Sequence, residues 1–157
     1  MKKILFLTGT RADFGKLKSL ITKIEKADSF DAHIFVTGMH MLSKYGIKEK
    51  EVEKWGFNSI YKYINQNRND SMEKKKKKTI QGLSDYCKEL KPDMIVVHGD
   101  RVEALAGAIV GSLNNILVTH IEGGEVSGTI DELIRHSVSK LAHIHFVANS
   151  KAQSRLL

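Results

Sequence analysis

The sequence predicts an α/β protein built on a doubly wound, mostly parallel sheet. Short apolar runs alternate with segments of helical periodicity, and no internal repeat interrupts the alternation. The chain has 157 residues, which fits one domain when a domain takes roughly 100–200 residues. Strands that alternate with helices form parallel sheets, because each crossover helix carries the chain back to the starting edge.

In the first half of the chain, strands are continuous apolar runs, as expected where a sheet is buried on both faces. Helices carry apolar residues at spacings of three and four. In order, we expect a strand at Lys3–Thr8, a loop at Gly9–Gly15, a helix through Ile24, a strand at Ala32–Thr37, a short charged helix near 47–54 and a strand at Ser59–Ile64.

The second half repeats the alternation with sharper boundaries. Pro92 ends a helix, because proline cannot continue the hydrogen-bond ladder. The helix after the fourth strand is rich in alanine and glycine, so it can pack closely against the sheet or a partner. In order, we expect a helix at Met72–Leu90, a strand at Met94–His98, a helix at Val102–Leu113, a strand at Ile116–Ile121, a helix at Ile130–Leu141, a strand at Ile144–Val147 and a helix from Ser150.

Charge and composition argue against several classes of protein. The net charge is +7, but five of the basic residues form the run Lys74–Lys78, which we interpret as a solvated helix face. A nucleic-acid surface spreads its basic residues over a face, so we expect no nucleic-acid partner. No apolar run approaches the roughly 20 residues of a membrane span, so we expect no membrane contact. Cys87 stands alone, which suits a reducing cytoplasm.

Polar residues follow the ends of four predicted strands. The carboxyl ends of parallel strands meet at one edge of a sheet, where α/β proteins bind their ligands. We therefore expect these side chains to converge on one site. They are Arg11 and Asp13 after the first strand, His40 after the second, His98, Asp100 and Arg101 after the fourth, and His120, Glu122, Glu125 and Asp131 after the fifth.

Each of these residues also has a structural interpretation. Arg11 could hold a phosphate by its planar fork or form an ion pair with Asp13. Asp100 could be a helix N-cap, and Asp131 could serve only the helix dipole. If Asp100, Glu122 and Asp131 lie close together, like charge and burial should raise the pKa of at least one of them, as a general acid requires.

We expect neither a nicotinamide cofactor nor a metal ion. The loop Gly9–Gly15 lacks the Gly-x-Gly-x-x-Gly pattern, and the second strand ends without an acidic residue for a ribose. The segment His98-Gly99-Asp100 is superficially similar to a metallophosphoesterase signature. The Asn-His and Gly-His ligand runs of those enzymes are absent from the sequence, so this interpretation is disfavoured.

Several motifs together resemble the UDP-N-acetylglucosamine 2-epimerase family, most closely its hydrolysing branch in sialic and legionaminic acid synthesis. These motifs, which occur in order, are 9–15 (Gly-Thr-Arg-Ala-Asp-Phe-Gly), 36–40 (Val-Thr-Gly-Met-His), 97–101 (Val-His-Gly-Asp-Arg), 120–132 (His-Ile-Glu-Gly-Gly-Glu-Val-Ser-Gly-Thr-Ile-Asp-Glu) and 134–143. The resemblance implies a glycosyltransferase-B-type fold in which residues 1–157 form the Rossmann-like N-terminal domain. It also implies a C-terminal nucleotide-binding domain outside this chain, a dimer or tetramer, and no cofactor.

The resemblance further implies the reaction and its residues. Such enzymes remove the C2 proton of UDP-N-acetylglucosamine while UDP leaves C1, and water adds to the glycal to give N-acetylmannosamine. By resemblance, the catalytic residues are Asp100, Glu122, Asp131 and His40. We expect the substrate to contact Arg11, Asp13, Arg101, His120, Glu125 and His136. Relatives often carry a serine or tyrosine near Phe14 and Gly15, and this chain has neither hydroxyl there.

Three alternative functions stay open at this point. The first is the same reaction on a UDP-2,4-diacetamido-trideoxy sugar, with nearly the same site residues. The second is a sugar-nucleotide binding domain without catalysis. The third is a basic nucleic-acid-binding module, whose affinity would fall steeply with salt and would depend on Lys74–Lys78.

Overall fold

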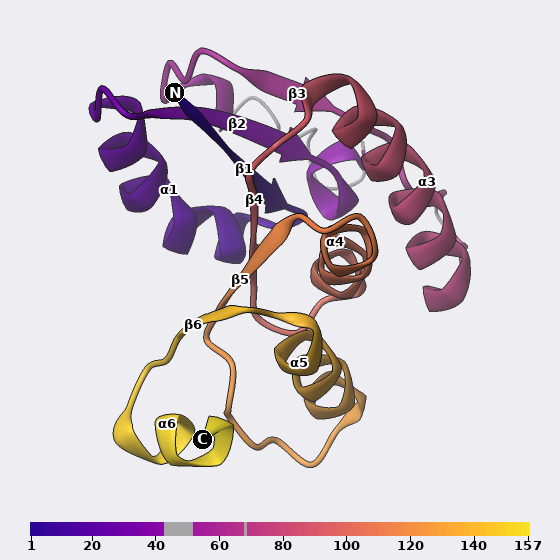
Figure 1. Cartoon of the computed structure of the whole chain (residues 1–157). Helices are drawn as coiled ribbons and strands as arrows, with labels where there is room; N and C mark the ends of the chain where they lie inside the picture. Colours follow the sequence, from indigo (N-terminus) through magenta and orange to yellow (C-terminus); the bar gives the residue numbers. More distant parts are fainter. Residues whose placement is uncertain (43–51, 68) are drawn as a thin grey trace.

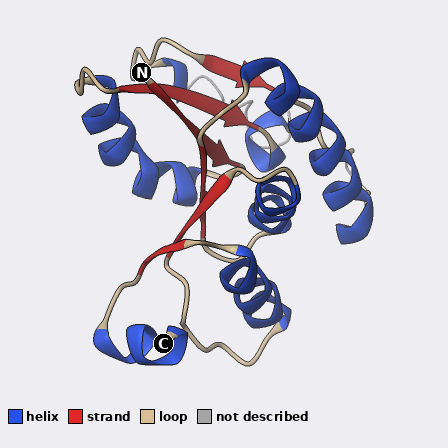
Figure 2. Cartoon of the chain, viewed as in Figure 1, coloured by secondary structure: helices blue, strands red, loops and turns tan. Residues whose placement is uncertain are grey.

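The computed structural model describes residues 1–42, 52–67 and 69–157. Over these residues the chain forms a six-stranded sheet in the order β3-β2-β1-β4-β5-β6 (Figures 1 and 2). Every neighbouring pair of strands is parallel, which confirms the predicted fold class. The strands are β1 (Lys2–Thr8), β2 (Phe30–Val36), β3 (Ile60–Lys62), β4 (Met94–His98), β5 (Leu117–Ile121) and β6 (Ile144–Phe146).

Helices cover both faces of this sheet. Figure 1 shows α1 on one face and α3, α4 and α5 side by side on the other. Within the described residues, no helix combines the length and the apolar character that crossing a bilayer requires. The helical elements are α1 (Arg11–Glu25), the 3₁₀ turn η1 (Gly38–Met41), α3 (Met72–Leu90), α4 (Val102–Leu113), α5 (Ile130–Leu141) and α6 (Ser150–Leu156).

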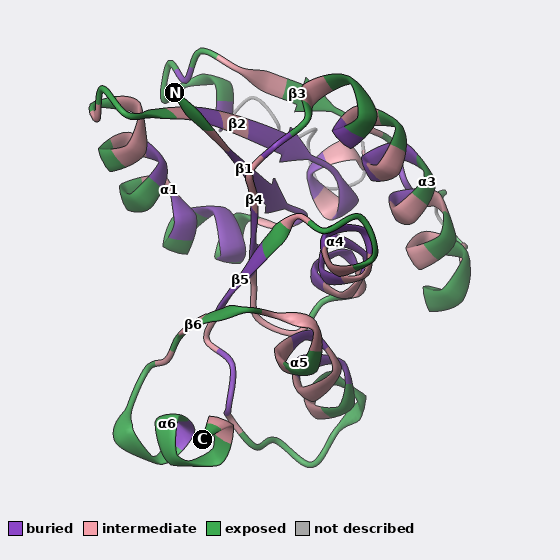
Figure 3. Ribbon diagram, viewed as in Figure 1, coloured by how far each residue is buried: buried purple, intermediate pink, exposed green. Residues whose placement is uncertain are grey.

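The core lies in two layers, one on each face of the sheet. Alternate residues of β1 supply both layers, because successive side chains of a strand point to opposite faces. Leu5 and Leu7 pack under α3, α4 and α5, whereas Ile4 and Phe6 pack against α1. Figure 3 shows the central strands as the most buried part of the chain, and β6 and α6 as largely exposed.

The small residues of α4 are used against the sheet. A Cβ atom added at Gly107 would lie 2.7 Å from Val97 Cγ1 and 2.8 Å from Leu7 Cδ2. Ala104 and Ala108 belong to the same buried layer. The sequence left open whether the small residues of α4 pack against the sheet or against a partner. The face of α4 that carries Ala104, Gly107 and Ala108 packs against the sheet.

The expected loop Gly9–Gly15 is wrong beyond its first two residues, because α1 begins at Arg11. Thr10 and Asp13 form a capping box: Thr10 Oγ1 accepts from the Asp13 amide at 3.3 Å, and the Asp13 carboxylate accepts from the Thr10 amide at 3.0 Å. This reciprocal pair starts the helix early. The turn η1 was not expected, and most of the charged helix expected near 47–54 lies outside the described residues.

The strand order positions a ligand site. The chain runs outward from β1 through β2 to β3 in one direction, and from β4 through β5 to β6 in the other. The loops that leave β1 and β4 therefore turn to opposite faces of the sheet and open a crevice between them. The first loop leads into α1 and the second into α4.

We predict that Gly107→Val lowers the free energy of unfolding by about 1–3 kcal/mol, because the added methyls meet Val97 and Leu7 in a packed layer. The control is Gly15→Ala, at an exposed position of α1 where no atom lies within 4 Å of the added Cβ. This control should raise the free energy by up to about 1 kcal/mol through helix propensity. Urea denaturation measures both, and an undiminished Gly107→Val stability would contradict the packing.

Candidate active site

A cavity of about 390 Å³ opens at the carboxyl ends of β1, β4 and β5. The loops after these three strands supply most of its wall, and Arg135 of α5 supplies part of the rest. The cavity thus lies at the edge where the sequence predicts a site. Its lining residues are Thr10, Ala12, Asp13, His98, Gly99, Asp100, Arg101, Glu122, Glu125, Arg135 and Ala148.

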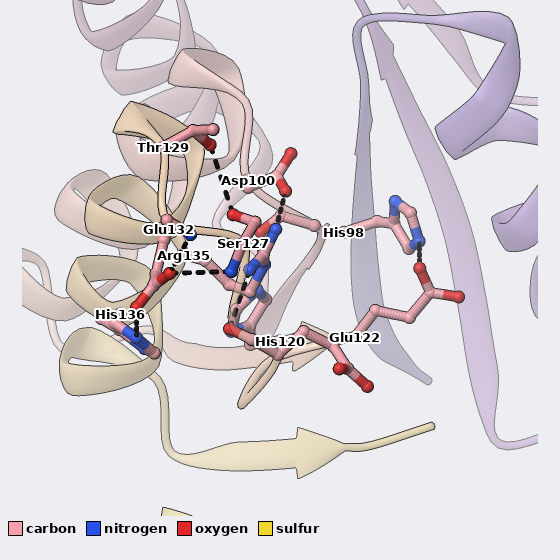
Figure 4. Close-up of polar contacts among 12 residues, drawn as sticks. His98, Asp100, His120, Glu122, Ser127, Thr129, Glu132, Arg135 and His136 are labelled. Carbon is pink, nitrogen blue, oxygen red and sulfur yellow. Dashed lines mark hydrogen bonds and ion pairs between the residues drawn. The ribbon is translucent and has the colours of Figure 1, made fainter. Parts of the chain in front are cut away.

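Glu122 is held between two basic side chains. Its Oε1 accepts from Lys16 Nζ at 2.9 Å, and its Oε2 lies 3.0 Å from His98 Nε2 (Figure 4). The hydrogen bond from Lys16, together with the charge of His98, lowers the pKa of Glu122 below its ordinary value. Glu122 is therefore not a carboxylate whose pKa is raised by neighbouring acids, because Lys16 and His98 are its hydrogen-bond partners.

The backbone at Glu122 is unusual for a residue with a side chain. Its φ is +63°, in the left-handed region, and its amide donates to the Phe146 carbonyl at 2.8 Å. Non-glycine residues rarely adopt this conformation, and it costs on the order of 1 kcal/mol or more. The chain turns here as it leaves β5, and the turn places the carboxylate over the end of β4.

Asp100 is paired with a buried arginine. Its Oδ2 accepts from Arg135 Nη2, and Arg135 Nη1 donates to the Glu125 carbonyl at 2.8 Å (Figure 4). Arg135 is only 7% exposed. The N-cap of α4 is Arg101 and not Asp100, so the N-cap interpretation of Asp100 is wrong. The guanidinium instead offsets the negative charge of Asp100.

Arg135 is a site residue that the sequence analysis missed. It lies on the face of α5 that also buries Ile134 and Val138. An arginine beside such an apolar stripe needs a partner, because a buried charge without one is costly. That signal was readable in the sequence, although its partner Asp100 is 35 positions away.

A second cavity of about 360 Å³ adjoins the first, and Thr10, Asp100 and Arg101 line both. Asp131 lines the second cavity and is exposed in the first turn of α5. Asp100 therefore lies between Glu122 on one side and Asp131 on the other. The three carboxylates border two adjoining hollows.

The lysine run is only partly a solvated face. Lys75 lines the second cavity, and Lys78 Nζ binds Asp70 Oδ2 at 2.6 Å. The other lysines of the run lie on the exposed or half-exposed first turns of α3. Two of the five charges thus have a defined position in the fold.

Asp13 and His40 form part of the support beneath the first cavity. Asp13 is buried, and its carboxylate accepts from Thr8 Oγ1 at 2.6 Å and from the Gly9 amide at 2.9 Å. His40 is 1% exposed, and its Nε2 lies 3.1 Å from Thr8 Oγ1. The Thr8 proton is donated to an acceptor oxygen, so His40 Nε2 is the donor in this contact. Arg11 lies exposed on the first turn of α1.

The remaining predicted residues fall in different surroundings. His120 is 0% exposed, whereas Glu125 lines the first cavity and accepts from Asn149 Nδ2 at 2.7 Å. His136 is half-exposed, and its Nε2 lies 3.3 Å from Glu132 Oε1 (Figure 4).

Glu132 organises the loop between Glu122 and Asp131. Its Oε2 accepts from the amides of Ser127, at 2.7 Å, and Gly128. These backbone hydrogen bonds lower the pKa of Glu132 below its ordinary value. These contacts of Glu132 with the preceding loop were not predicted from the sequence.

Within the described ranges, no three His, Cys, Asp or Glu side chains are grouped to hold a metal ion. The fold and the site together define an α/β domain with a cavity at the carboxyl edge of a parallel sheet, lined by carboxylates and by the basic side chains paired with them. The family model described as UDP-N-acetylglucosamine 2-epimerase matches residues 22–157. The chain belongs to this family.

Individual relatives agree with this assignment. The chain is 52% identical over 157 residues to a UDP-N-acetylglucosamine 2-epimerase of Neisseria meningitidis serogroup B, covering 100% of this chain and 42% of that protein. It is 37% identical over 160 residues to the UDP-N,N'-diacetylbacillosamine 2-epimerase (hydrolyzing) of Legionella pneumophila, with the same coverages. The chain therefore spans less than half the length of these relatives.

The fold also matches a solved structure of the family. The UDP-GlcNAc 2-epimerase of Methanocaldococcus jannaschii, in complex with UDP-GlcNAc and UDP, superposes with a TM-score of 0.83 at 26% identity. The match covers 99% of this chain and 42% of that one.

We predict that Lys16→Met raises the pKa of Glu122 and lowers the free energy of unfolding at pH 7 by about 0.2–1 kcal/mol, the usual range for a partly exposed pair. Because the folded-state pKa of Glu122 lies below its unfolded value, the pair stabilises the fold above the unfolded pKa. That contribution is lost as the pH falls through the folded-state pKa. The stability difference should therefore shrink below about pH 4.

Carboxyl NMR titration and urea denaturation at several pH values measure both effects. The control is Lys23→Met, two turns further along α1. An unchanged Glu122 titration in Lys16→Met would show that the lysine does not control this carboxylate.

Proposed function

We propose that residues 1–157 form the N-terminal domain of a hydrolysing UDP-N-acetylglucosamine 2-epimerase, whose nucleotide-binding C-terminal domain lies outside this chain. The proposal includes a dimeric or tetrameric assembly and a cytoplasmic location. Its main support is that Asp100 and Glu122, from neighbouring strand ends, border one cavity while each is paired with a cation. Family membership supplies the class of substrate, a UDP-sugar.

The proposed chemistry is an elimination followed by hydration. A carboxylate takes the C2 proton of the sugar, and the electron pair of that C–H bond forms the C1=C2 double bond. The bond between C1 and the phosphate oxygen breaks, and its electrons leave with UDP. Water then adds across the double bond and gives N-acetylmannosamine. Removing a weakly acidic C–H proton requires an ionised, positioned base.

Glu122 has the properties of such a base. Its lowered pKa keeps it ionised at neutral pH, and the same property makes it a poor proton donor. Lys16 holds one carboxylate oxygen, and His98, which lines the cavity, holds the other. Arg101, which lines both cavities, is placed to offset negative charge on the leaving phosphate.

Asp100 and Asp131 complete the proposed set of catalytic carboxylates. Asp100 lies between the two hollows, so it can act on a sugar bound in either of them. Asp131 is placed to assist departure of UDP or the addition of water from the second hollow. We propose that His40 acts from beneath the cavity through Thr8, and that Arg11 and Glu125 contact the nucleotide sugar from its rim.

A second candidate substrate is a UDP-2,4-diacetamido-trideoxy sugar. The observation that favours it is the 37% identity to a hydrolysing enzyme named for UDP-N,N'-diacetylbacillosamine. The two substrates differ at C4 and C6 of the sugar, away from the C2 proton. Incubating the complete two-domain protein with each one and following UDP release decides between them, and the preferred substrate should give the higher kcat/KM.

We predict that the complete protein releases UDP from its substrate in deuterated water and incorporates deuterium at C2 of the product. Glu122→Gln should lower kcat by about 10²–10⁴-fold, because an amide cannot take the proton. The control is Glu89→Gln, at an exposed position of α3. Tight UDP-sugar binding without UDP release or C2 exchange would instead indicate a binding domain without catalysis.

We also predict that residues 1–157 alone fold but release no UDP above background. Much of the nucleotide contact is expected from the domain outside this chain. Circular dichroism and the same UDP assay test this expectation. Turnover by the isolated chain would refute it.

A further inference from the structure

Gly99 is the turn residue between two side chains of the first cavity, His98 and Asp100. Its φ is +71°, a left-handed conformation that favours glycine. Its amide donates to the Ile121 carbonyl at 2.9 Å, and its carbonyl accepts from His120 Nε2 at 2.8 Å. The amide and the carbonyl of Gly99 are thus both bound to β5, so this strand determines where the turn lies.

The hydrogen bonds of His120 define its tautomer. A carbonyl oxygen only accepts, so Nε2 carries the proton that is donated to Gly99. In the neutral ring Nδ1 is then an acceptor, and Ser139 Oγ of α5 lies 3.0 Å from it and donates. The side chain of His120 is 0% exposed. Both ring nitrogens therefore face protein groups and neither faces the cavity.

The surroundings keep this ring neutral. Burial lowers the pKa of His120 to about 4, and the basic groups that face it from three elements act in the same direction. These groups are His98 of β4, His145 of β6 and Arg135 of α5. The His120 ring therefore stays neutral throughout the neutral pH range, and its Nε2 donates to the Gly99 carbonyl over that whole range.

The main chain closes over the pair formed by His120 and Ser139. A Cβ atom added at Gly123 would lie 2.8 Å from both His120 Nδ1 and Ser139 Oγ. There is accordingly no space for a substrate group between Gly123 and this pair. His120 and Ser139 thus lie behind the cavity wall and hold the Gly99 turn in place.

We propose that His120 and Ser139 are a positioning pair: Ser139 orients the His120 ring, and the ring holds the Gly99 carbonyl so that His98 and Asp100 meet the substrate in the reactive geometry. This inference rests on the proposed function for its kinetic consequence. It assigns Ser139 a role in the site and places His120 behind the substrate, where the sequence analysis expected a direct contact. The pair touches no reacting atom.

The test compares two replacements of His120 in the complete two-domain protein. In His120→Gln, the amide nitrogen can take the position of Nε2 and still donate to Gly99. In His120→Asn, the shorter amide cannot reach the carbonyl. Displacing catalytic groups by about 1 Å costs on the order of 100-fold in rate. We therefore expect kcat to fall about 100-fold in His120→Asn, to recover at least tenfold of that loss in His120→Gln, and KM to change little in either.

Ser139→Ala tests the second member of the pair, with Ser137→Ala as its matched control. Ser137 lies on the same helix, is half-buried like Ser139, and donates only to the Leu133 carbonyl at 2.8 Å among the contacts described for it. Loss of one hydrogen bond of ordinary strength predicts a fall in kcat of about fivefold for Ser139→Ala and none for Ser137→Ala. Thermal denaturation monitors folding of every variant.

Two readouts separate positioning from other roles. The pH–rate profile should keep its shape in all variants, because a neutral, buried ring contributes no titration to it. Nitrogen NMR of the unliganded protein should show a proton on His120 Nε2 at pH 6–8, and Ser139→Ala should shift the Nδ1 resonance alone. The NMR result needs no turnover, so it tests the pair even if the proposed function fails.

Three outcomes would overturn the proposal. They are a proton on Nδ1 in place of Nε2, equal kcat for His120→Gln and His120→Asn, and loss of one limb of the pH–rate profile in folded His120→Gln. Absence of turnover in the wild-type protein, with the NMR pattern intact, would overturn the proposed function and leave the hydrogen-bonded support in place.

Discussion

The hydrogen-bonded register between β4 and β5 is the constraint on which the site depends. Parallel pairing sets Val97 opposite His120 and His98 opposite Ile121. One residue beyond the register, Glu122 reaches back to His98, and the His120 ring reaches across to the Gly99 carbonyl. A slip of one residue would turn every side chain of a strand to the other face of the sheet. The core layers on both faces oppose such a slip, so the packing of the core also maintains the geometry of the site.

Opposite charges are matched around the cavity. Glu122 faces Lys16 and His98, and Asp100 faces Arg135. A half-buried carboxylate stays ionised only when hydrogen bonds and a cation offset its lost hydration. These contacts lower the pKa of Glu122, so this carboxylate stays ionised at neutral pH. The proposed elimination on a sugar needs an ionised base beside groups that offset the negative charge of a departing phosphate.

Part of the site could be predicted from the position of polar residues directly after the strands. Listing the polar residues after each strand identified His98, Asp100, Arg101, Glu122 and Glu125, all of which line the first cavity. The same rule could not separate a residue that faces the cavity from one that supports it. Asp13 lines the cavity and also caps α1, whereas His120 lies near the end of β5 and is fully buried. These side chains have the same polarity in the sequence, and only their surroundings distinguish them.

Patterns between neighbouring residues in the sequence were sufficient to predict the fold. Apolar runs, helical periodicity and Pro92 determined the alternation of elements, the parallel sheet and most boundaries, because these features depend on neighbours in the chain. Pairings between distant residues were decided by the tertiary structure. Arg135 meets Asp100 and Lys16 meets Glu122 across 35 and 106 positions. The direction in which the pKa of Glu122 shifts depends on these distances, because electrostatic interactions follow the separation of charges in space and not along the chain.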